Sequence, residues 1–412
     1  MRIEKTAAGR TDGLAVYVHI PFCVSKCAYC DFLSFPAGSP DGSDKRIEEY
    51  FATLITEIKA APQKGRRVSS IYFGGGTPSR PDPSYIARIM DSLGNVFSID
   101  ENAEVSIEAN PGTLGKDAPG RYLKAGINRM SLGVQSFDDG ELAALGRIHT
   151  AAEAEESYYL ARNAGFSNLN LDLIAAIPGQ NRESLLRTVE KAVSLNPEHI
   201  SLYSLIIEPG TPFYERYADQ VPDPHYDHTA KNTGKRQLPD EDEEREMMHA
   251  ACEELGKAGY DRYEISNFAR QSPGAPGKYR CRHNVNYWER GEYLGFGIGA
   301  ASLVNETRYS NVRDIAEYME RVKDSGFSVD EATVQDLTES DAEAEYMFLG
   351  LRMTEGVIER KFAERFGHSI GEVYGDVPDR FIADGLLERK DGRFFLTSRG
   401  LDLANTVMAG FV

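Results

Sequence analysis

The sequence predicts an α/β protein, a partial (β/α)6 barrel followed by a C-terminal α+β domain that is winged-helix-like. Three observations favour this fold class: strand-like runs alternate with helical patterns, polar and glycine-rich motifs follow those runs, and the last segment contains a hairpin pattern. At 412 residues the chain is longer than one ordinary domain. We expect the barrel in residues 1–217, a linker and accessory segment in 218–310, and the C-terminal domain in 311–412.

The composition narrows the class of protein. The formal net charge is −18 and the pI is about 5.0, which argues against nucleic-acid binding through clustered Lys and Arg side chains. No apolar run approaches the roughly 18 residues of a transmembrane helix, and residues 1–13 lack the apolar region of a secretory signal. Three of the five cysteines are clustered, which favours a reducing compartment over a disulfide framework. We therefore expect a cytoplasmic protein without a transmembrane segment or a nucleic-acid partner.

The expected barrel strands are runs rich in Val, Ile, Leu and Tyr, separated by amphipathic helical patterns. In full (β/α)8 barrels, functional groups lie where strands end and βα loops begin, and we extend this rule to a partial barrel by analogy. The six runs are Leu14–Ile20, Ser69–Phe73, Glu104–Glu108, Arg129–Val134, Asn168–Ala175 and His199–Ile207. The helical candidates are Ile47–Ala60, Pro83–Leu93, Ala151–Ala164 and Arg182–Leu195.

A cysteine cluster follows the first expected strand. Cys23, Cys27 and Cys30 have the spacing C-x3-C-x2-C. Three thiolates do not complete a structural zinc site, but they can hold three irons of a [4Fe–4S] cluster and leave the fourth iron open. An open iron indicates chemistry or ligand capture rather than electron storage alone. The alternatives are a chance grouping or a zinc site completed by one further side chain, His19, Cys252 or Cys281.

Further motifs follow the next strands. Gly74–Gly76 can let a backbone approach a ligand closely, although in isolation a plain strand-to-helix turn is the better explanation of such glycines. Glu108 closes the third strand, where its alternative role is a structural ion pair. Asp172 shares one face of the fifth strand with Asn170, and its alternative role is a barrel-facing partner of a Lys or Arg side chain.

The cysteine spacing, with Tyr29 before the third cysteine, resembles the radical S-adenosylmethionine superfamily. The motifs YVHIPFC, GGGTPS, SIEANPG, GVQSF, LDLIAAIPGQ and EPGTPF occur in this order. Together they resemble the family of oxygen-independent coproporphyrinogen III oxidase and its relatives over nearly the whole chain. The resemblance implies a [4Fe–4S] cluster on Cys23, Cys27 and Cys30, with S-adenosylmethionine on the open iron. It implies S-adenosylmethionine contacts at Tyr17, Tyr29, Gly75, Gly76, Thr77, Glu108, Gln135, Arg147 and Asp172.

A second aromatic motif lies in the segment expected to be accessory. His283–Trp288 reads HNVNYW and contains the only tryptophan of the chain. Neutral imidazole is a common metal ligand, and histidine is a frequent axial ligand of heme. The alternative is structural: His283 and Asn284 would brace the following glycine-rich segment, while Tyr287 and Trp288 would pack in the core.

The pattern HNxxYW resembles the HemW-type heme chaperones, the non-oxidase branch of the family. Phe32 stands where the oxidase branch has a fourth cysteine. The resemblance implies heme binding, with His283 as a candidate contact, delivery of heme to respiratory hemoproteins, and room for peripheral membrane association. Two alternatives stay open: a coproporphyrinogen III oxidase acting by radical decarboxylation, and a redox regulator that senses through its cluster.

The last segment predicts a hairpin, Leu386–Leu396, that turns at Asp391 and Gly392. Helical patterns precede it, and Ser398–Leu403 follows. This arrangement resembles a winged-helix module. Because the chain is strongly acidic, we expect this module to cover or dock rather than to bind DNA.

Overall fold

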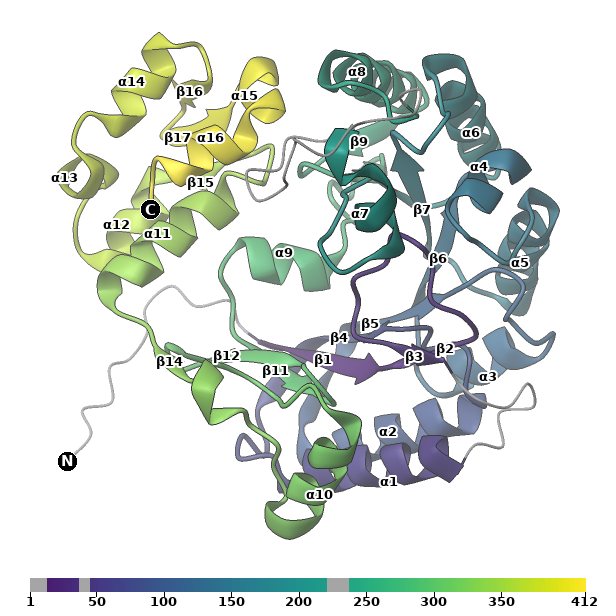
Figure 1. Ribbon diagram of the computed structural model, residues 1–412. Helices are drawn as coiled ribbons and strands as arrows, with labels where there is room; N and C mark the ends of the chain where they lie inside the picture. The colour runs from purple at the N-terminus through teal and green to yellow at the C-terminus, as the bar shows by residue number, and fades with distance from the viewer. Residues whose placement is uncertain (1–12, 37–44, 221–236) are drawn as a thin grey trace, which may run out of the picture.

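The computed structural model describes residues 13–36, 45–220 and 237–412, and one large twisted sheet dominates it (Figure 1). Its strand order is β14-β13-β12-β11-β1-β4-β5-β6-β7-β8-β10-β9. The six central strands pair in parallel. They are β1 (Leu14–Ile20), β4 (Arg67–Gly75), β5 (Ser98–Ala109), β6 (Arg129–Gln135), β7 (Leu169–Ala175) and β8 (His199–Ser204). The predicted partial (β/α)6 barrel is confirmed.

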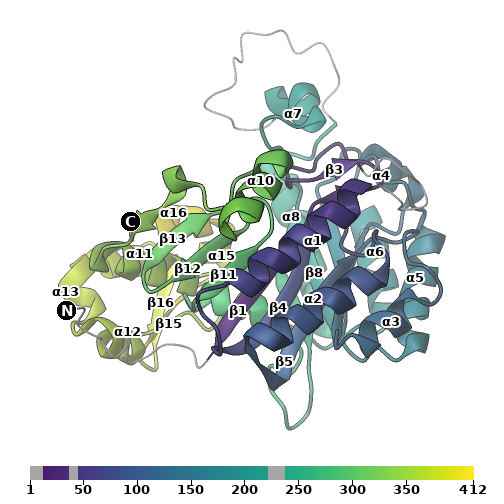
Figure 2. The same cartoon turned by 90° about the horizontal axis from the view of Figure 1, so that it is seen from below.

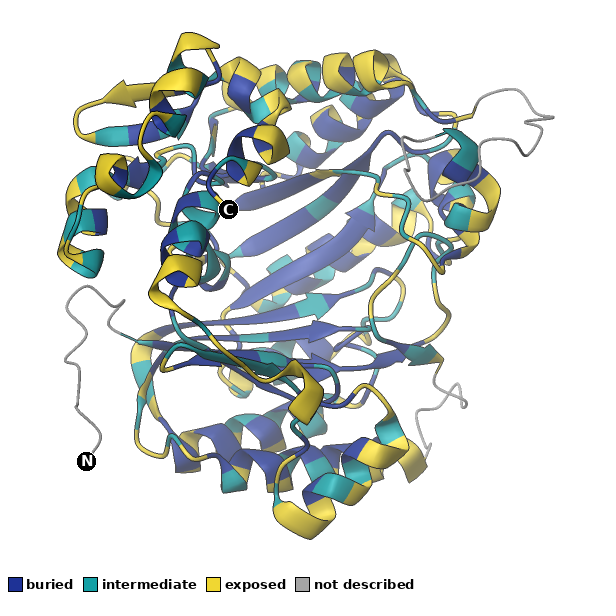
Figure 3. Ribbon diagram, turned by 60° about the vertical axis from the view of Figure 1, so that its left-hand side comes forward, coloured by how far each residue is buried: buried dark blue, intermediate teal, exposed yellow. Residues whose placement is uncertain are grey.

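Helices cover the outer face of the barrel and present their apolar side to the strands (Figures 2 and 3). Local signals fix their ends: α5 begins with a capping box of Thr150 and Glu153, and it ends at Gly165 with φ 115°. The covering helices are α1 (Lys45–Ala60), α2 (Pro83–Val96), α3 (Ala118–Lys124), α4 (Asp139–Ala144), α5 (Ala151–Ala164), α6 (Arg182–Ser194) and α8 (Glu241–Lys257). No helix of the described ranges is long and apolar enough to cross a membrane.

Strands that the sequence pattern did not predict extend the sheet on both sides of the barrel. They include β11 (Tyr293–Phe296), which pairs in parallel with β1, and β10 (Asn267–Arg270), which pairs antiparallel with β8. The others are β9 (Tyr260–Arg262), β12 (Ala301–Val304), β13 (Thr307–Ser310) and β14 (Gln335–Asp336). Strands β9 to β13 lie within 260–310, which we expected to be part of a linker and accessory segment, and β14 lies in the segment that we expected to form the C-terminal domain.

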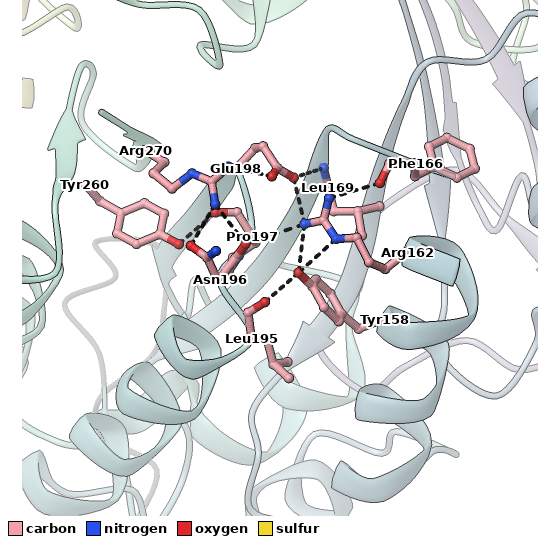
Figure 4. Close-up of polar contacts among 10 residues, drawn as sticks. All are labelled: Tyr158, Arg162, Phe166, Leu169, Leu195, Asn196, Pro197, Glu198, Tyr260 and Arg270. Atoms are coloured by element: carbon pink, nitrogen blue, oxygen red, sulfur yellow. Dashed lines mark hydrogen bonds and ion pairs between the residues drawn. The ribbon is translucent and has the colours of Figure 1, made fainter. Parts of the chain in front are cut away.

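The amino ends of β7 and β8 are joined by a network of charged side chains around Glu198 (Figure 4). The Glu198 carboxylate accepts hydrogen bonds from Arg162 of α5 at 2.9 Å, Arg270 of β10 at 2.7 Å and the Leu169 backbone at 3.0 Å. Nearby, the Tyr158 hydroxyl donates to the Leu195 carbonyl at 2.6 Å. Residues at this end of a barrel contribute to stability rather than to chemistry.

The C-terminal domain has its own apolar core, formed by side chains that include Met347, Phe362 and Phe411. Its small sheet has the order β15-β17-β16, and the predicted hairpin turns at Asp391 and Gly392, both with positive φ. Its elements are α11 (Glu339–Gly350), β15 (Val357–Ile358), α12 (Glu359–Phe366), α13 (Ile370–Tyr374), α14 (Val377–Ala383), β16 (Leu387–Lys390), β17 (Arg393–Leu396), α15 (Ser398–Asp402) and α16 (Ala404–Ala409). The winged-helix-like α+β domain is thus present.

Short elements complete the fold around the carboxyl end of the barrel and between the two domains. They are β2 (Phe22–Cys23), β3 (Phe35–Pro36), α7 (Pro212–Tyr217), α9 (Arg282–Trp288), α10 (Ile315–Ser325) and the 3-10 turns Ala218–Gln220 and Glu331–Thr333. A buried ion pair joins the domains: Arg290, 1% exposed at its side chain, bonds Glu345 of α11 at 2.8 Å.

Candidate functional site

The three clustered cysteines lie on the loop that follows β1, and all three are free thiols. Cys23 is buried, whereas Cys27 and Cys30 are half-buried. The Thr77 hydroxyl donates to Cys23 Sγ at 3.5 Å, and Arg147 Nη1 donates to Cys27 Sγ at 3.5 Å. The thiols of Cys23 and Cys27 therefore bond side chains from the loop after β4 and from the loop between α4 and α5.

The glycine-rich loop after β4 packs directly against the cysteine-bearing segment. A Cβ atom at Gly76 would lie 2.9 Å from the Pro21 carbonyl carbon, and one at Gly75 would lie 2.7 Å from the His19 ring. Gly75 also has φ 115°, which favours glycine. The Thr77 backbone N–H donates to the Phe22 carbonyl at 2.9 Å. These glycines are required by close packing on the cysteine loop, whatever ligand they also contact.

Two carboxylates face the barrel interior. Glu108 accepts from the Tyr72 hydroxyl at 2.8 Å and from the Gly75 backbone at 3.2 Å. Asp172 accepts from Ser131 at 2.7 Å and from Asn170 at 2.8 Å. Burial raises the pKa of Glu108 to about 7, with a further contribution from the negative charge of Asp172. Buried Arg129 supplies positive charge close to both carboxylates, and a ligand amine beside them would add a second cation.

Arg147 connects the cysteine loop to the ends of β5 and β6. Its Nη2 donates to Asn110 Oδ1 and to the Gly133 carbonyl, both at 2.8 Å. A Cβ atom at Gly133 would lie 2.8 Å from Asn110 Oδ1 and 3.0 Å from Gln135 Nε2, so these side chains meet over Gly133. The buried Nε of Arg147 has no hydrogen-bond partner within the described ranges. This unsatisfied donor suits an anionic ligand group near the cysteines.

The two tyrosines of the predicted site lie at different places on it. Tyr17 stacks on Tyr72 with ring centroids 6.4 Å apart, and its hydroxyl lies 3.0 Å from His19 Nδ1. Tyr29 contacts Phe213 of α7 with ring centroids 6.3 Å apart. Tyr29 borders an apolar cluster that includes Leu145 and Ile177. Apolar side chains therefore cover one side of the cysteine loop.

His283 is almost fully buried and contacts Tyr72, the residue whose hydroxyl bonds Glu108. Its imidazole is 1% exposed and stacks on the Tyr72 ring at 5.1 Å. Nδ1 lies 3.0 Å from the Ser70 hydroxyl, and Nε2 lies 3.0 Å from the Tyr287 hydroxyl. Burial lowers the pKa of His283 to about 3, so the ring is neutral at physiological pH.

The side chains of the HNxxYW motif on α9 make contacts in two different places. His283 and Tyr287 bond each other inside the barrel, whereas Trp288 joins a small apolar cluster with Tyr263 and Met353. The glycine-rich segment is braced by Asn286, whose Nδ2 donates to the Glu292 carbonyl at 3.1 Å. The alternative role considered for His283 and Asn284 was to brace this segment. Asn286, another residue of the motif, provides part of that bracing.

Sequence reasoning missed several polar residues that hold the site together. Asn110 donates to Thr77 at 2.8 Å while accepting from Arg147, so it links the contacts of Cys23 and Cys27. The Tyr72 hydroxyl donates a hydrogen bond to Glu108, and the Tyr72 ring stacks on the ring of His283. Glu104 accepts from the His283 backbone N–H at 3.1 Å. The sequence signal that could have identified these two residues is their position: Asn110 follows the end of a strand, and Tyr72 lies on the same strand face as Gly74.

Two family models match parts of the chain. The radical SAM superfamily matches residues 17–192, and the HemN C-terminal domain matches residues 337–403. A solved structure of coproporphyrinogen III oxidase (HemN) from Escherichia coli has a TM-score of 0.80 and 24% identity, covering 97% of this chain and 90% of that chain. Fold and site thus define a protein of the radical SAM class.

Whole-chain relatives narrow the class further. The chain is 34% identical to the heme chaperone HemW of Bacillus subtilis, over 97% of this chain and 99% of the relative. It is 33% identical to the heme chaperone HemW of Lactococcus lactis, over 97% of each chain. The chain belongs to the family of HemW heme chaperones.

Proposed function

We propose that this protein is a heme chaperone that carries a [4Fe–4S] cluster with S-adenosylmethionine, binds heme, and delivers it to respiratory hemoproteins. The observation that carries the proposal is the full-length relationship to HemW proteins, together with three free thiols gathered at the strand ends. Five free cysteines support a reducing, cytoplasmic setting.

The residues present fit the cluster and its cosubstrate. Three thiols suit a [4Fe–4S] cluster with one open iron. When bound, the cluster would supply one electron to S-adenosylmethionine. Tyr29, Gly75, Gly76, Thr77 and Gln135 would line the cofactor, with Tyr17 behind them. Glu108 and Asp172 would take its cationic groups, and Arg147 an anionic one.

Heme binding by His283 stays a proposal derived from the motif. Both ring nitrogens have hydrogen-bond partners, and the side chain is 1% exposed. Iron ligation through either nitrogen of this imidazole would require at least one of these hydrogen bonds to break and α9 to move. His283 would otherwise support heme binding by fixing α9 against β4.

Coproporphyrinogen oxidation is the second candidate, because the fold matches that of HemN with a TM-score of 0.80. Phe32, which stands in place of the fourth cysteine of the oxidase branch, is 68% exposed beside the cysteine loop. The relationship to HemW proteins ranks the chaperone first.

The test is a hemin titration of the anaerobically reconstituted full chain, followed by absorbance and paired with an anaerobic coproporphyrinogen turnover assay. Saturable stoichiometric binding without turnover supports the chaperone. Turnover without saturable hemin binding would replace it with the oxidase. The variant His283→Ala separates the roles of this side chain: loss of binding with an unchanged melting temperature would assign it direct contact.

A further inference from the structure

A pocket of about 430 Å³ lies between α9 of the barrel and the C-terminal domain. Figure 1 shows α9 between the barrel strands and the helices of that domain. The lining includes Trp288 at the end of α9, Tyr346 of α11, Lys361 and Arg365 of α12, and Arg393 of β17. Its volume is in the range typical of sites for small organic molecules. Neither domain forms this pocket without the other.

Aromatic side chains give the pocket surfaces suited to a flat ring system. The Arg352 guanidinium lies 4.3 Å from the centroid of the Trp288 ring and holds the indole in place. Tyr346 lies under the Arg365 guanidinium at 5.5 Å. Met353 and Val357 add apolar lining. An aromatic ligand can contact such side chains with its edge or its face.

The pocket lining holds three basic side chains, Lys361, Arg365 and Arg393, and three acidic ones, Glu289, Glu355 and Glu364. Lys361 is exposed and forms no ion pair with any residue in the described parts of the chain. The lining acid Glu355 bonds Arg280, outside the lining, at 2.6 Å and lies 3.8 Å from Arg393. Glu364 lies 3.7 Å from Arg360, also outside the lining. Lys361 thus has no competing carboxylate among the described residues, and Arg393 shares Glu355 with Arg280, so both cations can meet ligand carboxylates.

We propose that this pocket binds the carboxylate-bearing edge of heme, with the ring edge against Trp288 and Tyr346 and the carboxylates paired with Lys361 and Arg393. This inference rests on the proposed heme binding and adds the place in the molecule where heme binds. Heme held here contacts the HNxxYW motif through Trp288, while His283 stays buried on the barrel side of α9. The C-terminal domain then supplies half of the heme site.

The experiment measures hemin affinity by absorbance titration of the reconstituted full chain, with hemin and hemin dimethyl ester as two probes. The variants are Lys361→Glu with Arg393→Glu, and Lys361→Met alone as a milder change at an exposed position. Lys323→Glu, at an exposed position of α10 outside the pocket lining, is the matched charge control. We expect the double variant to bind hemin at least about tenfold more weakly, Lys361→Met to bind it more weakly to a smaller extent, and the control to match wild type.

The two probes separate charge pairing from a general disturbance. Because the dimethyl ester has no carboxylate, its affinity should be the same for wild type and both pocket variants. Equal weakening of both probes, or unchanged hemin affinity in the double variant, would overturn the pocket while leaving the chaperone proposal intact. Absence of saturable hemin binding by the wild type would overturn both.

Discussion

Glu57 shows how one buried carboxylate can organise a distant loop. This α1 residue accepts hydrogen bonds from the Gly297 backbone at 2.9 Å, the Tyr318 hydroxyl at 2.8 Å and Asn311 Nδ2 at 2.7 Å. It thereby ties the glycine-rich segment after α9 to the outer face of the barrel. Burial raises the pKa of Glu57 to about 7 in spite of these donors.

This raised pKa predicts a pH-dependent contribution to stability. Below the ordinary value of 4.5 the carboxyl is protonated in both folded and unfolded chains, so its contribution is fully present. As pH rises through about 7, the contribution is lost, by up to about 3 kcal/mol. Urea unfolding between pH 5 and 8 should show this decline in the wild type, and Glu57→Gln should be less stable at pH 5 but show a flatter profile. Identical profiles of stability against pH for the wild type and Glu57→Gln would contradict the assignment of this pH dependence to Glu57.

Asn110 joins the side chains that contact two of the cluster cysteines, Thr77 at Cys23 and Arg147 at Cys27. Asn110→Ala should weaken S-adenosylmethionine binding about tenfold while the iron content stays near that of wild type, because Arg147 and Thr77 lose a shared partner at a cost of about 1 kcal/mol or more. Equilibrium dialysis and iron analysis of reconstituted protein would measure this. Asn128→Ala removes a comparable amide just before β6, where it bonds Val105 and Ala103, and should leave the affinity unchanged.

At the scale of elements, the barrel divides into a stabilising end and a functional end. The amino ends of β7 and β8 hold the Glu198 network, whereas the opposite ends of the central strands hold the cysteines and carboxylates. Glu198→Ala should lower the free energy of unfolding by about 3 kcal/mol, because Arg162 and Arg270 lose their shared carboxylate. Iron content and hemin affinity of the folded variant should stay unchanged.

Chemical denaturation with a matched control checks this division. Glu253→Ala removes a carboxylate from an exposed pair with Lys257 on α8 and should leave the unfolding midpoint unchanged. Equal effects of the two substitutions, or loss of iron in Glu198→Ala, would show that the two ends are not separable.

The elements also show what the sequence could and could not predict. β1 and α5 have the predicted bounds, because long apolar periodicity and a capping box are local signals. Strands β9 to β14 have two to four residues each, too few to show a period, and they form only because the edges of the barrel offer hydrogen-bonding partners. Motifs placed the site at the strand ends, but the bonds of Asn110 and Tyr72 depend on neighbours distant in sequence.

At the scale of the whole molecule, the C-terminal domain is held to the barrel by charge as well as by packing. Glu345 bonds the buried Arg290 at 2.8 Å and Arg308 at 2.6 Å. Glu345→Ala removes this partner while Arg290 keeps its ion pair with Glu306 at 2.6 Å, so it should loosen the domain junction and lower the stability by roughly 2–3 kcal/mol. Hydrogen exchange should accelerate in α9 and α11 more than in β4 to β7. Uniform acceleration would mean that the domains unfold as one unit.

The central claim is that this chain carries heme for other proteins. The most direct measurement loads the reconstituted full chain with radiolabelled heme and follows its transfer to the apo-form of a respiratory hemoprotein after separation of the two. The account predicts that label moves to the acceptor and restores its heme absorbance, and that Lys361→Glu with Arg393→Glu carries less label. Heme that stays on the chain, or that reaches the acceptor no faster than free hemin does, would contradict it.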